Sequence, residues 1–353
     1  MTKGAVCHNG LPSDYLRKLN RQKRAPYYFL GIFFLLGMVP FFCRNDYYVH
    51  VMIAIFYTVI YTSTYRFILR TGQFHFGAHA FIGIGAYASV LLVTRAGWSF
   101  WAAMPAAGII AAVCALVVGF PILRLKGIYF AIITWGLGDT LRFIYMRFKN
   151  PFGGALGIFS IPGPNPITLP GFGIIDFSQK SHYYILALTL MMLTLYVLYR
   201  LERSRIGLVF GAIREGDQLA RAIGINIMNY KVLAFAVCSG LAAMGGSFYA
   251  HYTYYISPQD FTVLLTIYLA IYTVVGGQDS YFGAIVGTVV LSLAGEIFAG
   301  YSHYQLIMYS TFMIVVLLFL PQGLVSFPRY IAKRFVDKSA NEAKGQGNES
   351  ALT

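Results

Sequence analysis

Charged residues are scarce in this chain, and their scarcity excludes an ordinary soluble protein. Only 11% of the 353 residues are Asp, Glu, Lys or Arg, whereas soluble domains contain about 25%. Hydrophobic residues make up 58% of the chain. This composition is typical of a membrane protein, and the length suits one polytopic bundle as well as it suits several soluble domains.

Cysteine and the common catalytic motifs are also missing or rare. The chain has four scattered cysteines, Cys7, Cys43, Cys114 and Cys238, and their spacing fits neither a zinc site nor a disulfide framework. The sequence contains no Walker-type loop, no His-Glu-x-x-His helix and no Gly-x-Ser-x-Gly turn. We therefore predict no catalytic residue, no metal site and no cofactor. If the chain moves a solute uphill, a partner must supply the energy.

What the chain has instead is a series of apolar runs of membrane-spanning length. A helix needs about 20 mostly apolar residues to cross a hydrocarbon core about 30 Å thick. The fold class we predict is an all-α polytopic membrane bundle of about ten spans, within a range of roughly eight to eleven because some runs are short or contain glycine. The predicted spans are residues 27–43, 47–65, 76–93, 98–123, 127–145, 183–199, 231–256, 262–277, 281–299 and 304–327.

The positive charges gather in a few loops and do not indicate binding to nucleic acid. The formal net charge is +14, and Lys and Arg are enriched in cytoplasmic loops of membrane proteins. This rule, with an even number of spans, puts both termini in the cytoplasm. The domains we predict are a basic cytoplasmic segment at 1–26, a transmembrane domain at 27–327 with a cytoplasmic loop at 200–230, and a polar cytoplasmic tail at 328–353, which we expect to be disordered.

A polar island at 204–230 interrupts the apolar runs. Its apolar residues fall on one helical stripe: Val209, Ile213, Gly216, Ala220 and Ile223. Its polar residues fall on the opposite stripe: Arg214, Asp217, Gln218 and Arg221. This pattern predicts a short amphipathic helix, which either lies on membrane lipid or docks onto a soluble partner.

Ionisable residues within the apolar runs call for an explanation, because inserting a charged side chain at mid-membrane costs about 2.5–3.5 kcal/mol of free energy. We expect Arg66 and Arg95 to extend from the edges of their spans toward water. Asp139 and Arg142 are one helical turn apart and are expected to pair with each other. None of these residues forms a proton relay, and this weakens the hypothesis of an ion-coupled transporter.

Two histidines at the start of the third predicted span have the spacing of a metal site. His75 and His79 would lie on one face of a helix, a legitimate arrangement for two ligands. No carboxylate or cysteine accompanies them, so the site would be incomplete. The polar residues here more plausibly line a path or a bend.

Small residues recur at a spacing of four, as in Gly283–Gly287 and Ala242–Gly246. In lipid, such pairs let two helix backbones approach closely. We expect them to serve helix packing, with a pore wall as the alternative.

Several blocks of sequence resemble a known family when they are taken in order. The polar island and the span after it resemble the permease subunits of branched-chain amino-acid ABC importers, the LIV-type family. The matching positions there are Arg214, Glu215, Ala220, Gly224, Ile225, Asn226, Lys231, Ala234 and Phe235. Three further blocks match: Gly83-Ile84-Gly85-Ala86-Tyr87, Val275-Gly276-Gly277 and Pro321-Gln322-Gly323-Leu324. The resemblance covers roughly residues 60–325.

The resemblance implies a set of partners and a role for the island. The family's cytoplasmic helix is similar to a coupling helix that docks onto an ATP-hydrolysing subunit, and the coupling residues would be Arg214, Glu215, Ala220 and Gly224. The partners implied are a second, similar permease subunit, two ATP-binding subunits and an extracytoplasmic substrate-binding protein. The location implied is the bacterial inner membrane, crossed many times.

Departures from the family pattern put the cargo in doubt. Histidine replaces a serine at His75, and Asp279 adds a carboxylate where the family has no side chain. An amino acid of the branched-chain class is the expected cargo, with urea or an amide as the alternative. We place the translocation path at Gln73, His75, His79, Gly83, Gly85, Tyr87, Gly153, Gly154, Asp279 and Ser280. Two other classes of function remain: a gradient-driven carrier or channel that acts alone, and a membrane scaffold.

Overall fold

The computed structural model describes residues 31, 33–38, 45–125, 127–169, 173–175, 177, 179–222, 224–301, 304–319 and 323–326. The predicted segments 1–26 and 328–353 lie outside the described residues, and only a few residues of the run at 27–43 lie within them. Each of the later predicted runs contains one α-helix of 14 residues or more.

These helices form the body of the protein, and their order follows the predicted runs. They are α3 (Asp46–Leu69), α4 (Ala78–Thr94), α5 (Phe100–Ile122), α6 (Ile128–Arg147), α8 (Lys180–Arg203), α11 (Ile227–Thr253), α12 (Val263–Gly276), α13 (Gly283–Ala299) and α14 (Gln305–Phe319). Among the described residues, α3, α5, α8 and α11 are long and apolar enough to cross a membrane by themselves, and α4, α12, α13 and part of α14 are shorter apolar helices. The protein is therefore a polytopic helical membrane protein.

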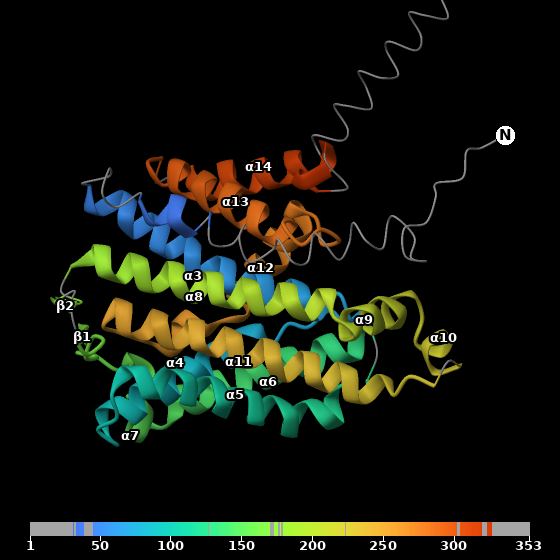
Figure 1. The fold of residues 1–353 in the computed structure, drawn as a ribbon, viewed down its shortest axis with the longest axis horizontal. Helices are drawn as coiled ribbons and strands as arrows, with labels where there is room; N and C mark the ends of the chain where they lie inside the picture. Colours follow the sequence, from blue (N-terminus) through green and yellow to red (C-terminus); the bar gives the residue numbers. More distant parts are fainter. Residues whose placement is uncertain are drawn as a thin grey trace, which may run out of the picture.

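The long helices lie side by side, and the short elements gather at the two ends of the bundle (Figure 1). At one end lie α7 (Lys149–Phe152), η1 (Gly154–Leu156) and an antiparallel hairpin of β1 (Ile167–Leu169) and β2 (Gly173–Ile175). At the other end lie α9 (Arg205–Glu215) and α10 (Asp217–Ala222). We call these the hairpin end and the α9–α10 end. The all-α prediction thus holds for the bundle. In the described part of the chain it missed this short hairpin, which lies between α6 and α8 in the sequence, and an isolated bridge between Ile158 and Ile256.

Helix α11 packs against α4 and α5 at several glycines. An added Cβ at Gly85 of α4 would overlap the Ala243 carbonyl of α11, and one at Gly246 of α11 would overlap the Ile82 carbonyl of α4. Gly240 of α11 likewise faces Gly108 of α5. The small residues therefore bring the helix backbones together, as expected for packing in lipid.

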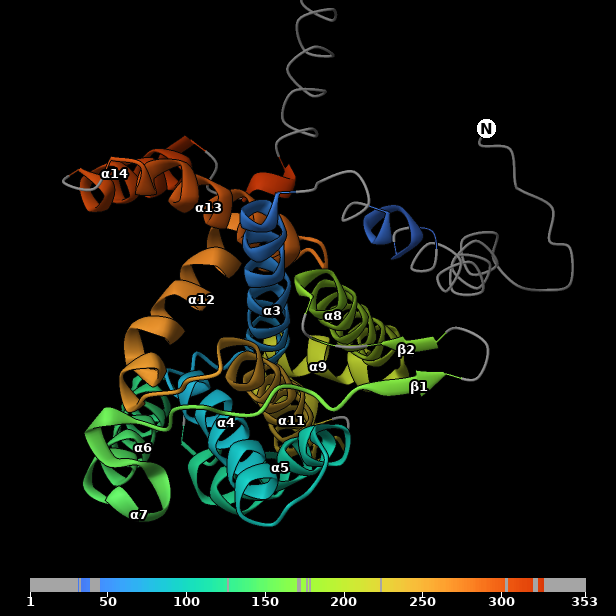
Figure 2. The same ribbon diagram turned by 90° about the vertical axis from the view of Figure 1, so that its left-hand side faces the viewer.

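A second group of close contacts holds the α9–α10 end of α12. Substituents at Gly276 and Gly283 would overlap the backbone of the α12–α13 turn. Gly323, which has a φ of 86°, packs on Gly277 just before η3 (Leu324–Ser326). The other end of α12 follows η2 (Pro258–Phe261) and has no comparable glycine contact among the described residues. The end view shows α12 leaning away from α3 toward α6 (Figure 2).

Candidate functional site

The polar island folds as two short helices, so the prediction of one continuous helix was wrong. Ser204 caps α9 by accepting a hydrogen bond from the Ile206 N–H at 3.2 Å. Helix α9 ends at Gly216, whose extended backbone separates it from α10. Gly224, with a φ of 81°, follows α10 and donates its N–H to the Arg221 carbonyl at 2.9 Å. A glycine therefore follows each of the two short helices.

The inner face of this two-helix unit carries the apolar stripe. Phe210 and Ile213 of α9 are each 3% exposed, and Ala220 of α10 is 1% exposed. The Phe210 ring meets the Phe67 ring of α3 edge-on, with centroids 5.4 Å apart. Ile213 and Ala220 of the predicted stripe are therefore buried against the protein's own helices, whereas Val209 and Gly216 are partly exposed. Ile223, its last predicted member, lies outside the described residues.

The outer face carries two leucines and most of the expected coupling residues. Leu208 of α9 is 77% exposed and Leu219 of α10 is 67% exposed. Arg214, Glu215 and Gly224 are also exposed, whereas Ala220 lies on the inner face. The exposed part of this unit thus combines apolar side chains with charges of both signs.

A buried ion cluster lies beside α9, and it overturns the expectation for Arg66. Arg66 lies in the last turn of α3, at the end of its span as expected, but it is 2% exposed, so the prediction that it extends toward water was wrong. Its Nη2 lies 2.5 Å from Glu202 Oε2 of α8, and Arg70 also pairs with Glu202. Its Nη1 donates to the Gln278 carbonyl at 3.4 Å. Pairing and hydrogen bonding offset the cost of burying this charge.

Two further ion pairs attach the α9–α10 unit to the bundle. Arg214 Nη1 lies 2.5 Å from Asp279 Oδ1 in the turn between α12 and α13. Lys231 Nζ of α11, which is 7% exposed, lies 3.1 Å from Asp217 Oδ1 of α10. Asp279, expected on the translocation path, therefore lies next to Arg214 at the α9–α10 end. Ser280 lies in the same turn and donates its N–H to the Gly277 carbonyl.

The histidine segment enters the bundle as irregular chain with a bend at Phe76, so His75 and His79 do not share a helix. Helix α4 begins only at Ala78. His75 stacks on Tyr65 of α3 with ring centroids 4.9 Å apart, and His79 Nδ1 lies 3.0 Å from Thr266 Oγ1 of α12. Gln73 is also buried, at 6% exposure. In the described part of the chain, no three His, Cys, Asp or Glu residues form a group that could hold a metal ion.

The remaining residues expected on the path do not converge on one place. Gly83 faces Phe261, and Gly85 faces Ala243. Tyr87 stacks on Tyr145 with centroids 4.2 Å apart. Gly153 and Gly154 both have positive φ in the turn at the hairpin end. The predicted path residues therefore extend from one end of the bundle to the other. The expected pair of Asp139 and Arg142 does form, at 3.1 Å.

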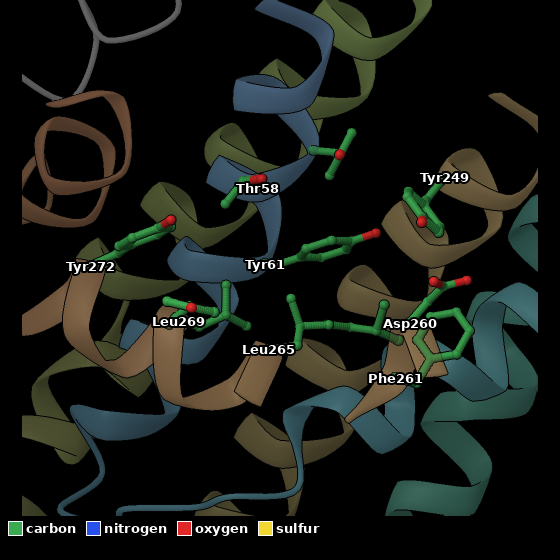
Figure 3. A pocket seen from close by; sticks show the side chains of 11 residues that line it. Thr58, Tyr61, Tyr249, Asp260, Phe261, Leu265, Leu269 and Tyr272 are labelled. Carbon is green, nitrogen blue, oxygen red and sulfur yellow. The ribbon is translucent and has the colours of Figure 1, made fainter. Parts of the chain in front are cut away.

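The sequence analysis missed a cavity of about 250 Å³ between α3, α11, η2 and α12 (Figure 3). Its wall is lined by Tyr57, Thr58, Tyr61, Ile82, Tyr249, Asp260, Phe261, Leu265, Tyr268, Leu269 and Tyr272. We call it the tyrosine cavity. Burial raises the pKa of the Asp260 carboxyl above its usual range. The signal in the sequence was a lone carboxylate in the stretch Ser257-Pro258-Gln259-Asp260-Phe261, between two apolar runs.

Comparison of the sequence with known proteins places this chain in a family. The family described as branched-chain amino acid transport system, permease component, matches residues 47–321. The high-affinity branched-chain amino acid transport system permease protein LivM of Salmonella typhimurium is 30% identical over 293 residues, which cover 78% of this chain and 68% of that protein. LivM of Escherichia coli is 31% identical over 276 residues, covering 73% of this chain and 65% of that protein.

More distant relatives share a smaller part of the chain. LivH of Escherichia coli is 27% identical over 153 residues, 42% of this chain and 48% of that protein. The nucleoside ABC transporter permease protein NupC of Lactococcus lactis is 28% identical over 110 residues, 31% of this chain and 33% of that protein. No solved structure matches the chain. The chain spans about two thirds of the length of the two LivM proteins.

Proposed function

The chain belongs to the permease family of the branched-chain amino acid transport system, and on this basis we propose that it carries a branched-chain amino acid as one membrane subunit of an ABC importer. The observation that carries the proposal is the extent of the match. Residues 47–321 include the described helices from α3 to α14, apart from Asp46, the first residue of α3. The sequence contains no ATP-binding motif of its own. A transporter of this kind needs a separate ATPase.

The proposed topology has about ten spans, with both termini in the cytoplasm. The described helices would supply all but the first, which would come from the run at 27–43. The charge distribution supports this orientation, since Arg200, Arg203, Arg205 and Arg214 all lie at the α9–α10 end. The hairpin end would then face outward. The proposed location is the bacterial inner membrane.

We propose the outer face of the α9–α10 unit as the docking site for an ATP-binding subunit. Two observations support a protein partner over lipid. Ile213 and Ala220 of the apolar stripe are already buried, and among the described residues of α9 and α10 the large exposed apolar side chains are Leu208 and Leu219. The charges around them include both signs, as in Arg214 and Glu215, whereas a helix on anionic lipid is predominantly basic. The other partners proposed are a second ATP-binding subunit, a second permease subunit and an extracytoplasmic binding protein.

The ion pairs give a route by which docking could act on the bundle. Movement of α9 would pull on Asp279 through Arg214, and movement of α10 would pull on α11 through Lys231. Arg66 connects the α12–α13 turn to α3 through the Gln278 carbonyl. ATP would drive transport only if its binding favours one arrangement of these helices over another.

The test is uptake of radiolabelled leucine by the full importer carrying Glu215→Arg or Gly224→Trp. Both residues are exposed, and a Cβ at Gly224 meets no atom within 4 Å. We expect about a tenfold loss of uptake, the effect of disrupting an important interface contact, with an unchanged amount of permease in the membrane. Gly224→Ala controls for the strain of a positive φ, and Gly136→Trp on α6 places the same bulk in open space away from the unit.

Normal uptake by both variants would contradict the docking assignment. The cargo is tested separately by supplying leucine, isoleucine, valine, urea and acetamide to the unmodified importer. Accumulation of urea or acetamide in place of the amino acids would contradict the proposed substrate and leave the docking face intact.

A further inference from the structure

The tyrosine cavity contains one carboxylate, which is held rigidly and is not paired with a base. Asp260 closes a capping box at the start of η2: its Oδ2 accepts the Ser257 N–H at 2.8 Å, and the Ser257 side chain accepts the Asp260 N–H. The side chain is half-buried, and in the described part of the chain no Lys or Arg pairs with it. A partly buried carboxylate without a cation is costly unless a positive group can reach it.

Aromatic rings surround the approach to this carboxylate. The ring centroid of Tyr57 lies 5.8 Å from that of Tyr61 and 5.6 Å from that of Tyr249. Tyr268 and Tyr272 form a second pair across the cavity, with centroids 6.4 Å apart. An ammonium group is attracted to the face of such rings as well as to a carboxylate. This part of the wall therefore suits an ammonium ion.

One tyrosine offers a hydrogen bond that the fold itself does not use. Tyr61 is 3% exposed, and its buried hydroxyl has no hydrogen-bond partner among the described residues. Figure 3 shows the Tyr61 side chain extending across the cavity, with its hydroxyl toward the side of Tyr249 and Asp260. An unpaired buried hydroxyl costs about 1–3 kcal/mol. A carboxylate of a bound molecule would relieve this cost by accepting a hydrogen bond from the hydroxyl.

The rest of the wall is apolar. Ile82, Phe261, Leu265 and Leu269 line it, and Ile82, Phe261 and Leu269 are each no more than 2% exposed. The volume of about 250 Å³ is several times the ~30 Å³ that one water molecule occupies in the liquid. The cavity therefore combines a site for an ammonium, a donor for a carboxylate and a surface for an aliphatic side chain.

We propose that the tyrosine cavity binds the zwitterionic, aliphatic amino acid during its passage through the permease, with the ammonium at Asp260 and the carboxylate at the Tyr61 hydroxyl. This inference rests on the proposed import of an amino acid and names the place in this chain where the cargo is held. It also explains why a carboxylate stands among tyrosines. The capping box holds Asp260 so that the ligand supplies its counterion.

The first test measures leucine uptake by the full importer, with Asp260→Asn and Tyr61→Phe compared at equal amounts in the membrane. Asparagine keeps an oxygen that can accept the Ser257 N–H, so the cap survives while the charge is lost. Phenylalanine removes a hydroxyl that bonds to nothing in the described fold, so the fold is not weakened. We expect about a tenfold rise in the leucine concentration for half-maximal uptake from each variant. Asp46→Asn is the matched control, because Asp46 lies at the start of α3 with its side chain 77% exposed and its pair with Lys180, at 3.6 Å, is a surface pair that contributes little.

A second measurement detects the charge preference of the cavity without relying on transport. Thr58→Cys, in a full importer whose permease cysteines are replaced by alanine, places one thiol in the cavity wall. We expect a methanethiosulfonate reagent bearing an ammonium to react about tenfold faster than one bearing a sulfonate. Leucine should slow the reaction, and Asp260→Asn should abolish the preference.

The outcomes distinguish the proposed import of an amino acid from the proposed binding of that amino acid in the tyrosine cavity. An unmodified importer that takes up no amino acid would contradict the proposed function. Normal leucine import by the unmodified protein, together with unchanged half-maximal concentrations in Asp260→Asn and Tyr61→Phe, would overturn the cavity proposal alone. Equal labelling by both reagents, unaffected by leucine, would also overturn it.

Discussion

One side of α11 packs on α4 and α5 with backbone against backbone. Its other side packs on α3, where an added Cβ at Gly245 would meet the Tyr61 ring at 2.7 Å, and borders the tyrosine cavity at Tyr249. On the packed side, Gly85 and Gly246 leave no room for a Cβ. On the cavity side, the Tyr249 ring meets the Tyr57 ring of α3 edge-on with centroids 5.6 Å apart, and both tyrosines line the cavity together with residues of α12. The same helix thus packs closely on α4 and α5 and forms part of the wall of the tyrosine cavity.

The difference indicates which parts of the bundle can move relative to each other. Backbone contacts as close as those at Gly85 resist any sliding, since dense interiors have few alternative arrangements. Among the described residues, the glycine contacts of α12 lie in its half nearer the α9–α10 end, where Gly287 of α13 meets Tyr272 and Gly323 meets Gly277 just after the helix. Its opposite end borders the cavity through Leu265 and Leu269. A motion that opens or closes the cavity would therefore be expected at η2 and the start of α12, with α4, α5 and α11 as the fixed reference.

The largest effect is expected on the packed side, from Gly85→Val. The new side chain would overlap the Ala243 carbonyl, and overpacking against backbone should destabilise the protein by at least about 3 kcal/mol. The thermal midpoint of the purified protein in detergent is the measurement. Gly136→Val on α6 is the control, because a Cβ there meets nothing within 4 Å; its cost should stay within about 1 kcal/mol. Equal midpoints for the two variants would remove the distinction between the two sides of α11.

An intermediate effect is expected on the cavity side, from Thr58→Phe. The added ring has a void to enter, so stability should change by less than about 1.5 kcal/mol. Leucine uptake should nevertheless fall about tenfold, because the ring occupies the space proposed for the cargo. Thr140→Phe on α6 is matched to it, since each threonine donates its hydroxyl to the carbonyl four residues earlier at 2.7 Å. Unchanged uptake in Thr58→Phe would show that the cargo passes elsewhere.

The smallest effect is expected from Thr58→Val, which keeps the shape of the wall. The Thr58 hydroxyl already bonds to the Ala54 carbonyl within α3, so its loss should change stability by less than about 1 kcal/mol. Leucine uptake should remain within about twofold of the unmodified protein. A larger loss of uptake with normal stability would mean that this hydroxyl bonds to the cargo, and would enlarge the proposed polar site.

The positions of the long helices could be predicted because they follow from local composition. Each run from 47–65 to 304–327 became a helix, since a backbone in an apolar surrounding must satisfy its own hydrogen bonds. The polar island shows the limit of the same reasoning. Its apolar stripe was correct for Ile213 and Ala220, which are buried, but the helical pattern passed through Gly216, where the chain is extended.

The candidate site was harder to predict because its contacts join distant parts of the chain. Arg66 was expected at a membrane edge, and its partner Glu202 is 136 positions away. His75 and His79 had a helical spacing, yet helix α4 begins only at Ala78, between them. The tyrosine cavity draws its wall from α3, α4, η2, α11 and α12. No periodicity within one segment predicts such a meeting.

By itself, the sequence determined that this protein is a membrane bundle, where its helices lie along the chain, and which loop carries the positive charge. These features depend on the hydropathy and charge of short stretches of sequence, and these properties do not depend on contacts between helices. Three features were decided by the tertiary structure alone. Arg66 is buried beside Glu202, α11 packs closely on α4 and borders the cavity at Tyr249, and Asp260 lies in a cavity wall that contains several tyrosines. Those outcomes depend on side-chain shape and on the desolvation of polar groups, which take their values only when distant segments pack together.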